Sequence, residues 1–218
     1  MPSDPAFASA PTGPATDGTD AAPPDPPTTR ERIVYAGAEL FRRQGYAGTG
    51  IKHIAVHADA TLGSVYHFFP GGKDQLADEV LRTAGRFFLA LYEAIAAGAP
   101  DLASAVRDFF AGAAETLETT GYADACPIAT VAGDIASTNP LLRETTADVF
   151  ESWLAALAED AVEAGIAAER ARRLALGVLA LLEGAFLLSR SLRSLEPMTA
   201  CGEAAVGLVQ DAIAEVRT

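Results

Sequence analysis

The sequence predicts an all-α protein in which a small N-terminal head of three short helices precedes a larger helical body. Half of the 218 residues are hydrophobic, and Ala and Leu dominate over Val, Ile and Thr, which favours helices over strands. Apolar residues recur at helical spacing along most of the chain, and no segment alternates as a strand does. Gly and Pro interrupt this periodicity where helices are expected to end.

Residues 1–29 are expected to form a disordered arm. They contain eight of the 13 prolines and almost no large apolar side chain, so they have little to bury in a core. The arm carries no Lys or Arg and no sustained apolar stretch, so it does not have the composition of a signal peptide.

The head is assigned to residues 30–75. A first helix of about four turns follows the arm and ends at Gly45. Thr49 is the expected N-cap of a second, short helix, and Thr61 of a third. The break between them at 58–60 leaves two short helices joined by a tight turn, which is the helix-turn-helix plan.

The body is assigned to residues 76–218 and is expected to bind a ligand and to dimerise. Its helices are longer and are separated by segments rich in Gly and Pro. They are predicted at roughly 73–97, 101–119, 128–137, 140–164, 168–193 and 197–216.

Charge is distributed unevenly between the head and the rest of the chain. The formal net charge is −13, which by itself disfavours a nucleic-acid partner. The segment 30–73, however, holds six basic and three acidic residues, including both lysines, so its net charge is +3. The remaining 10 basic and 26 acidic residues give −16. This asymmetry predicts a DNA-facing head on an acidic body.

Residues 30–97 resemble the TetR family of transcriptional regulators. The resemblance lies in A-G-A-E-L-F-R-R-Q-G-Y from Ala36, in T-G-I-K-H-I-A from Thr49 and in G-S-V-Y-H-F-F-P-G-G-K from Gly63. In the body, C-P-I-A-T-V-A-G-D from Cys126 resembles the LmrA/YxaF-like subgroup. The resemblance implies a cytoplasmic homodimer that represses genes and leaves its operator when a small, largely apolar ligand binds.

The resemblance and the residue chemistry together select a set of expected DNA contacts. Tyr66, His67 and Lys73 are expected to orient the head on phosphates, whereas Lys52 and the start of the third helix read bases. Asp59 stands where the family turn usually has Gly, and Asp tolerates a left-handed backbone. The full set is Thr49, Lys52, Thr61, Leu62, Gly63, Ser64, Tyr66, His67 and Lys73.

The expected body contains two further sets of predicted functional residues, one for a ligand cavity and one for a dimer interface. Aromatic and apolar residues at helical spacing are expected to line a cavity, with Asp134 as a polar anchor unless it is simply solvated. These are Phe88, Leu91, Phe110, Cys126, Ile128, Val131, Asp134, Phe150, Trp153 and Leu181. An apolar stripe and a row of small residues predict a dimer interface at Leu174, Val178, Leu182, Ala185, Ala205 and Leu208.

Other chemistry finds little support in the sequence. His53 and His57 have the spacing of paired metal ligands but lack a third ligand, so no metal, cofactor or catalytic site is expected. Cys126 suits a buried, pocket-lining thiol better than a redox sensor. The apolar run Leu174–Leu182 is too short to span a membrane. A helical protein-binding adaptor, or a ligand-binding protein without DNA binding, remains the alternative.

Overall fold

The fold is entirely helical across the residues that the computed structural model describes, 26–135 and 137–216. The arm predicted to be disordered lies outside them up to residue 25. The helices are α1 Thr29–Gln44, α2 Ile51–His57, α3 Leu62–Phe68, α4 Gly72–Gly98, α5 Leu102–Thr119, α6 Pro127–Ile135, α7 Pro140–Glu163, α8 Ala168–Leu192 and α9 Glu196–Val216. The predicted bounds of the six body helices, α4 to α9, are each confirmed to within two residues.

Side-chain caps explain where several helices begin. Thr28 forms a capping box with Glu31 at the start of α1. The Asp101 carboxylate accepts a hydrogen bond from the Ser104 amide at 2.7 Å at the start of α5. Each cap satisfies an amide that has no partner inside its helix.

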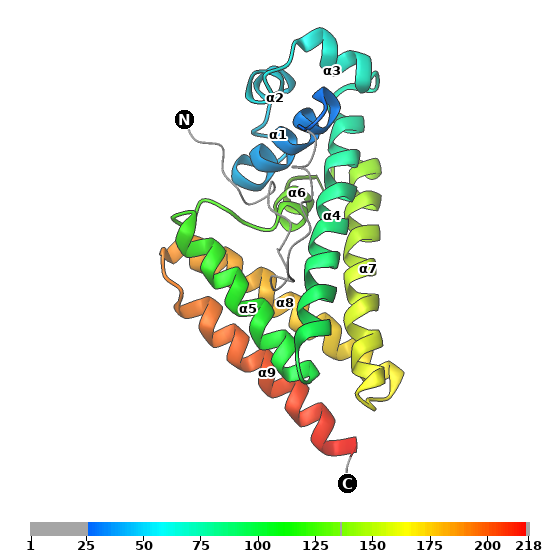
Figure 1. Ribbon diagram of the computed structural model, residues 1–218, viewed down its shortest axis with the longest axis vertical. Helices are drawn as coiled ribbons and strands as arrows, with labels where there is room; N and C mark the ends of the chain where they lie inside the picture. Colours follow the sequence, from blue (N-terminus) through cyan, green and yellow to red (C-terminus); the bar gives the residue numbers. More distant parts are fainter. Residues whose placement is uncertain (1–25, 136, 217–218) are drawn as a thin grey trace, which may run out of the picture.

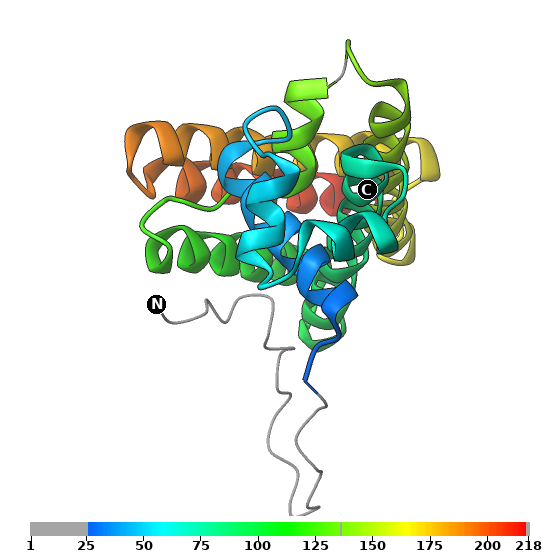
Figure 2. The ribbon, with the colours of Figure 1, turned by 90° about the horizontal axis from the view of Figure 1, so that it is seen from above.

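The head lies at one end of an elongated molecule (Figure 1), with α2 and α3 outermost and α1 beneath them. The long α4 runs from the head along the body beside α7, and α6 lies between α1 and the rest of the body. Seen from the head end, α5, α9 and α8 cross the body as a layer (Figure 2), and α9 contacts both of its neighbours.

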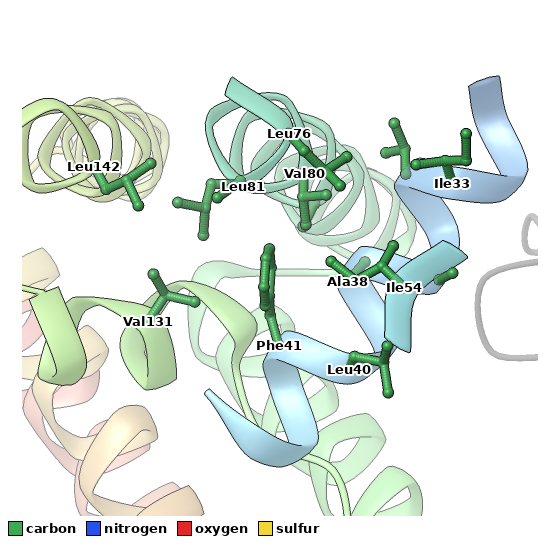
Figure 3. Close-up of a cluster of buried hydrophobic side chains, with 14 of the residues drawn as sticks. Ile33, Ala38, Leu40, Phe41, Ile54, Leu76, Val80, Leu81, Val131 and Leu142 are labelled. Carbon is green, nitrogen blue, oxygen red and sulfur yellow. The ribbon is translucent and has the colours of Figure 1, made fainter. Parts of the chain in front are cut away.

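One buried apolar cluster joins the head to the body. It contains residues of α1, α2, α3, α4, α6 and α7. Phe41, with no exposed surface, projects from α1 toward Leu81 of α4 and Val131 of α6 (Figure 3). The predicted boundary at 75/76 falls inside α4, so this helix belongs to both parts. The head is therefore packed on the body rather than tethered to it.

A second buried cluster fills the body between α5, α7, α8 and α9. The long helix α8 has the length and mean hydropathy, 1.6, of a membrane span, with a third of that stretch buried. It nevertheless packs along both α7 and α9 and carries Glu183 within the apolar stretch. A core helix of a globular protein has the same composition, so length and hydropathy do not assign it to a membrane.

Candidate nucleic-acid interface and ligand cavity

The helix α3 is anchored by its buried face and presents the other face to solvent. Val65 of α3 and Phe69, the residue directly after the helix, have no exposed surface and hold α3 in the head core. Thr61 caps the helix, because its Oγ1 accepts the Ser64 amide at 3.0 Å. Tyr66 and His67 lie exposed near its C-terminal end. The helix thus offers short polar groups at its start and two larger donors further along.

The turn before α3 is held in place by hydrogen bonds from Arg32 of α1. Asp59 has φ of 47°, which confirms that this Asp adopts the left-handed conformation expected of it. Arg32 donates from Nε to the Ala58 carbonyl at 3.1 Å and from Nη2 to the Asp59 carbonyl at 3.4 Å. These bonds tie the turn between α2 and α3 to α1.

The structure leaves most of the predicted DNA-contact set accessible on the head. Lys52, Thr61, Gly63, Tyr66 and His67 are exposed, and Leu62, Ser64 and Lys73 are partly buried.

Thr49 does not fit its two predicted roles. It has no exposed surface, and its Oγ1 donates to the Gly45 carbonyl at 2.8 Å. The cap of α2 is Gly50, which makes no side-chain cap bond. The predictions that the Thr49 side chain caps α2 and contacts DNA are therefore wrong, because the short side chain satisfies the end of α1 instead.

Much of the positive charge of the head is paired with acidic side chains of the same chain. Arg42 and Arg43 pair with Asp124 at 3.0 and 3.2 Å, and Arg30 pairs with Glu79 at 2.8 Å. Lys52 is exposed on α2 and makes no ion pair with the residues that the structure describes. The simple count of +3 therefore overstates the charge available to a phosphate backbone.

Lys73, expected to bind a phosphate, is engaged with the loop after α1. Its Nζ donates to the Tyr46 carbonyl at 2.6 Å and lies 3.9 Å from the centre of the Tyr46 ring. Burial lowers the pKa of this lysine. The ammonium holds the loop against the start of α4, so its role in the free protein is structural.

A cavity of about 350 Å³ lies in the body, a volume within the usual range for ligand pockets. Its walls come from α4, α5, α7 and α8, and most of the side chains are apolar or aromatic. At its head side it is lined by Arg42 of α1 and by Asp124 and Cys126 of the segment before α6. The head helix α1 therefore contributes directly to the cavity wall.

Half of the predicted ligand-binding set lines this cavity, namely Phe88, Leu91, Phe110, Cys126 and Trp153. The other half does not. Ile128 and Val131 are fully buried in the cluster that joins head to body, and Phe150 packs against that cluster. Leu181 packs against the second cluster.

Asp134, predicted as a polar anchor for the ligand, serves the head instead. Its carboxylate accepts a hydrogen bond from the Ala47 amide at 3.1 Å. It also lies so close to Gly45, whose φ is 72°, that a Cβ there would collide with Oδ2. The predicted anchor role is therefore wrong, because this carboxylate fastens α6 to the loop after α1.

Sequence reasoning missed the charged groups of the cavity. Arg42 and Asp124 form an ion pair with side chains 6% and 3% exposed, and Glu183 lines the α8 wall. An acid inside an otherwise apolar helical run was a signal for Glu183. The pairing of Arg42 with Asp124 left no signal in the sequence, because 82 positions separate the two residues.

Burial raises the pKa of Glu183 to about 7 and that of the neighbouring Cys126 thiol well above its ordinary value. In each case the cause is the loss of water around the charged form. A thiol that stays protonated is a poor nucleophile, so Cys126 lacks the character of a reactive cysteine.

The predicted dimer interface lies mostly inside one chain. Five of its six residues are core residues of the second buried cluster: Leu174, Val178, Leu182, Ala185 and Ala205. Val178 and Leu182 also line the cavity. Only Leu208 is exposed, at 44%. The α8 part of the predicted stripe is the face that packs inside its own chain.

Other leucines of α8 are exposed to solvent. Leu176, Leu187, Leu188 and Leu192 are between 47% and 67% exposed. Together with Leu208 of α9 they form what we call the leucine face.

Comparison with known proteins decides the family. Residues 33–80 match the bacterial regulatory proteins of the TetR family, and residues 103–204 match the LmrA/YxaF-like C-terminal domain of transcriptional regulators. The transcriptional regulator YxaF of Bacillus subtilis is 31% identical over 175 residues, which span 80% of this chain and 92% of that protein. The chain belongs to the TetR family.

Further relatives and solved structures agree with this assignment. The regulator LmrA of Bacillus subtilis is 28% identical, covering 78% of this chain and 90% of that protein. A TetR regulator from Chloroflexus aurantiacus superimposes with a TM-score of 0.71 at 29% identity, covering 84% of this chain and 94% of that one. One from Rhodobacter sphaeroides has a TM-score of 0.76 at 20% identity, covering 83% and 98%.

Membership defines the general activity. This TetR protein is a helix-turn-helix DNA-binding transcriptional regulator, and its family consists of regulators rather than enzymes. The DNA-binding head is the part formed by α1, α2 and α3.

Proposed function

We propose that this TetR protein is a cytoplasmic repressor that binds its operator as a homodimer and leaves it when a largely apolar ligand enters the body cavity. The observation that carries the proposal is that α1 of the DNA-binding head forms part of the cavity wall through Arg42. A relative that matches 44% of this chain is named a transcriptional repressor, which supports repression.

DNA recognition is assigned to the exposed face of α3. A Cβ added to Gly63 would meet nothing closer than Thr61 Oγ1, at 3.6 Å, so packing within the chain does not require a glycine there. A missing side chain on an exposed recognition helix instead permits close approach to base edges. Tyr66 orients the head through a phosphate, whereas Ser64 lies where a base would be read.

Gel-shift titration with the promoter beside the gene tests this assignment. Tyr66→Ala weakens binding to operator and unrelated duplexes by the same factor, whereas Ser64→Ala changes the ratio between them. Tyr35→Ala, on the exposed side of α1, serves as the control with unchanged affinity. An unmodified protein with no duplex affinity at low salt would favour the adaptor or DNA-independent ligand binder instead.

The leucine face is assigned to a second copy of the chain. Five large apolar side chains are exposed on the adjacent helices α8 and α9, and exposed apolar surface of this extent suits an interface. A two-fold pairing of copies would present two heads, which suits recognition helices about 34–36 Å apart in successive major grooves.

Sedimentation of matched variants tests the dimer. Leu188 and Leu141 are both 48% exposed, but Leu141 lies on α7, outside the leucine face. Leu188→Glu is expected to yield monomers that lose operator affinity, and Leu141→Glu is expected to remain dimeric. Equal behaviour of the two variants would refute the assigned interface.

Ligand release is assigned to the contact between the cavity and α1. A ligand that moves Asp124 shifts the partner of Arg42 and Arg43, and both arginines belong to α1. If the DNA-competent and ligand-bound arrangements differ at this contact, the ligand lowers DNA affinity by linkage. The test is operator release by apolar compounds, expected for the unmodified protein and lost in Asp124→Asn at a temperature where circular dichroism shows this variant folded. Equal release from both proteins would contradict the coupling.

A further inference from the structure

The polar side chains of the cavity wall differ in whether they already have a partner within the protein. Tyr92 donates its hydroxyl to Asp160 Oδ2 at 2.5 Å. Arg42 and Asp124 pair with each other at 3.0 Å. Asp124 Oδ2 is buried and accepts no hydrogen bond from the described part of the chain, but it faces the Arg42 charge. Glu183 differs, because its buried Oε1 has neither a hydrogen-bond donor nor an ion-pair partner among the residues that the structure describes. Among the described residues of the wall, Glu183 Oε1 is therefore the acceptor that has neither a donor nor a counter-charge.

The surroundings of Glu183 make an unpaired oxygen unfavourable there. One hydrogen bond joins its carboxyl group to the Cys126 thiol, and the cavity around it is lined mainly by apolar side chains such as Leu182 and Phe186. A buried polar atom without a partner destabilises the folded state, and a leucine at this place on α8 would avoid that penalty. A ligand that supplies the missing donor recovers part of this free energy when it binds.

We propose that Glu183 is the anchor of the effector site and that the effector is an apolar molecule carrying an amine, whose N–H groups bind Oε1. This inference rests on the proposed function of the cavity. It names the chemical class of the ligand and the residue that selects that class.

An amine fits this wall better than an alcohol or an acid does. An ammonium group supplies both the hydrogen bond and the opposite charge that a desolvated carboxylate needs. An alcohol supplies only the hydrogen bond, and an acid places a second carboxylate beside the first. Aromatic rings at Phe88, Phe109 and Trp153 in the same cavity attract a cation through their faces.

Calorimetric titration of the full-length protein with matched probes tests the inference. Phenylbutylamine, phenylbutanol and phenylbutyrate share one apolar body and differ in the polar end. The amine is expected to bind about tenfold or more tightly than the alcohol at pH 8, as a hydrogen bond to a charged group predicts. The acid is expected to bind most weakly.

Glu183→Gln keeps the shape of the side chain and removes its charge. It is expected to weaken amine binding by about tenfold or more and to change alcohol binding little. Glu151→Gln, on the exposed side of α7, is the control that leaves all three affinities unchanged. An amine that binds no better than the alcohol, or that binds Glu183→Gln as tightly as the unmodified protein, overturns the inference.

A second readout needs no variant. With a pKa of about 7, roughly half of the Glu183 carboxyl groups carry a proton at pH 7. Binding of an ammonium group releases this proton to the buffer. The amine's binding heat is then expected to depend on the buffer's ionisation enthalpy, whereas the alcohol's is not. The other titratable groups lining the cavity are Arg42, Tyr92, Asp124 and Cys126. Equal buffer dependence for both probes contradicts the assignment to Glu183.

The operator assay separates this inference from the proposed function. If the amine binds through Glu183 and does not release the operator, the anchor stands and the effector role fails. If a different apolar compound releases the operator while the amine does not bind, the effector role stands and the anchor fails.

Discussion

Neutralising Asp124 is expected to destabilise the protein strongly, because it breaks the ion pair at the junction of head and body. In Asp124→Asn the Arg42 side chain, 6% exposed, loses the carboxylate at 3.0 Å. Arg43 loses the same partner at 3.2 Å but keeps Glu39 at 2.8 Å. The loss therefore falls mainly on Arg42, the more deeply buried of the two arginines.

The size of the effect follows from burial. Removing one partner of a buried pair costs about 3–5 kcal/mol, because the other charge stays buried without compensation. Asn keeps one acceptor oxygen, so we expect the lower end, about 3 kcal/mol. The exposed pair of Arg172 and Glu151, at 2.6 Å with side chains 39% and 64% exposed, gives the contrast. Glu151→Gln is expected to cost at most about 1 kcal/mol.

Urea unfolding followed by circular dichroism at one fixed protein concentration measures both variants. A fixed concentration is needed because dimerisation makes stability depend on it. The double variant Arg42→Met with Asp124→Leu removes both charges and is expected to recover most of the loss. If Asp124→Asn costs no more than Glu151→Gln, the pair does not hold the head to the body, and the reasoning fails.

Two further predictions concern packing and pH. Gly85→Ala places a Cβ 2.6 and 2.9 Å from the two Cγ atoms of Val149 where α4 meets α7, and we expect a loss of about 1–2 kcal/mol in thermal unfolding. Gly133→Ala, where the added Cβ meets nothing within 4 Å, is the control and is expected to gain up to about 1 kcal/mol, because Ala favours a helix over Gly. A Gly85→Ala protein at least as stable as the unmodified one would contradict the close approach. The raised pKa of Glu183, about 7 against 4.5 unfolded, means that the folded state keeps a proton that the unfolded state releases. The contribution of Glu183 to the free energy of unfolding is therefore greatest below pH 4.5. As pH rises from 4.5 to above 7, the unmodified protein is expected to lose about 3 kcal/mol of this free energy relative to Glu183→Gln. Parallel stability curves for the two proteins between pH 5 and pH 8 would contradict this.

The helices were predictable because their signals are local. Caps such as Thr61 and breakers such as Pro140 act on the adjacent turn of the chain, and apolar spacing identifies a face within one helix. The left-handed Asp59 belongs to the same class, because a single residue's steric preference decides it.

The site was predicted less well wherever a side chain had more than one possible neighbour. The spacing of Leu174, Val178 and Leu182 identified an apolar face of α8 correctly but could not say what that face contacts. In the structure it packs on the chain's own helices and the cavity, and the leucine face consists of other residues. Thr49 and Asp134 were polar residues at plausible binding positions, but each is bonded to backbone groups of the head.

The sequence alone determined the all-α class, the order and bounds of the helices, the helix-turn-helix head and, through its motifs, the family. Tertiary structure decided that Arg42 and Asp124 meet at the cavity, that half of the predicted ligand residues lie elsewhere, and that the head shares its core with the body. The physical reason is range: helix formation depends on neighbours a few residues apart, whereas a cavity or an ion pair depends on which distant segments the packed helices bring together.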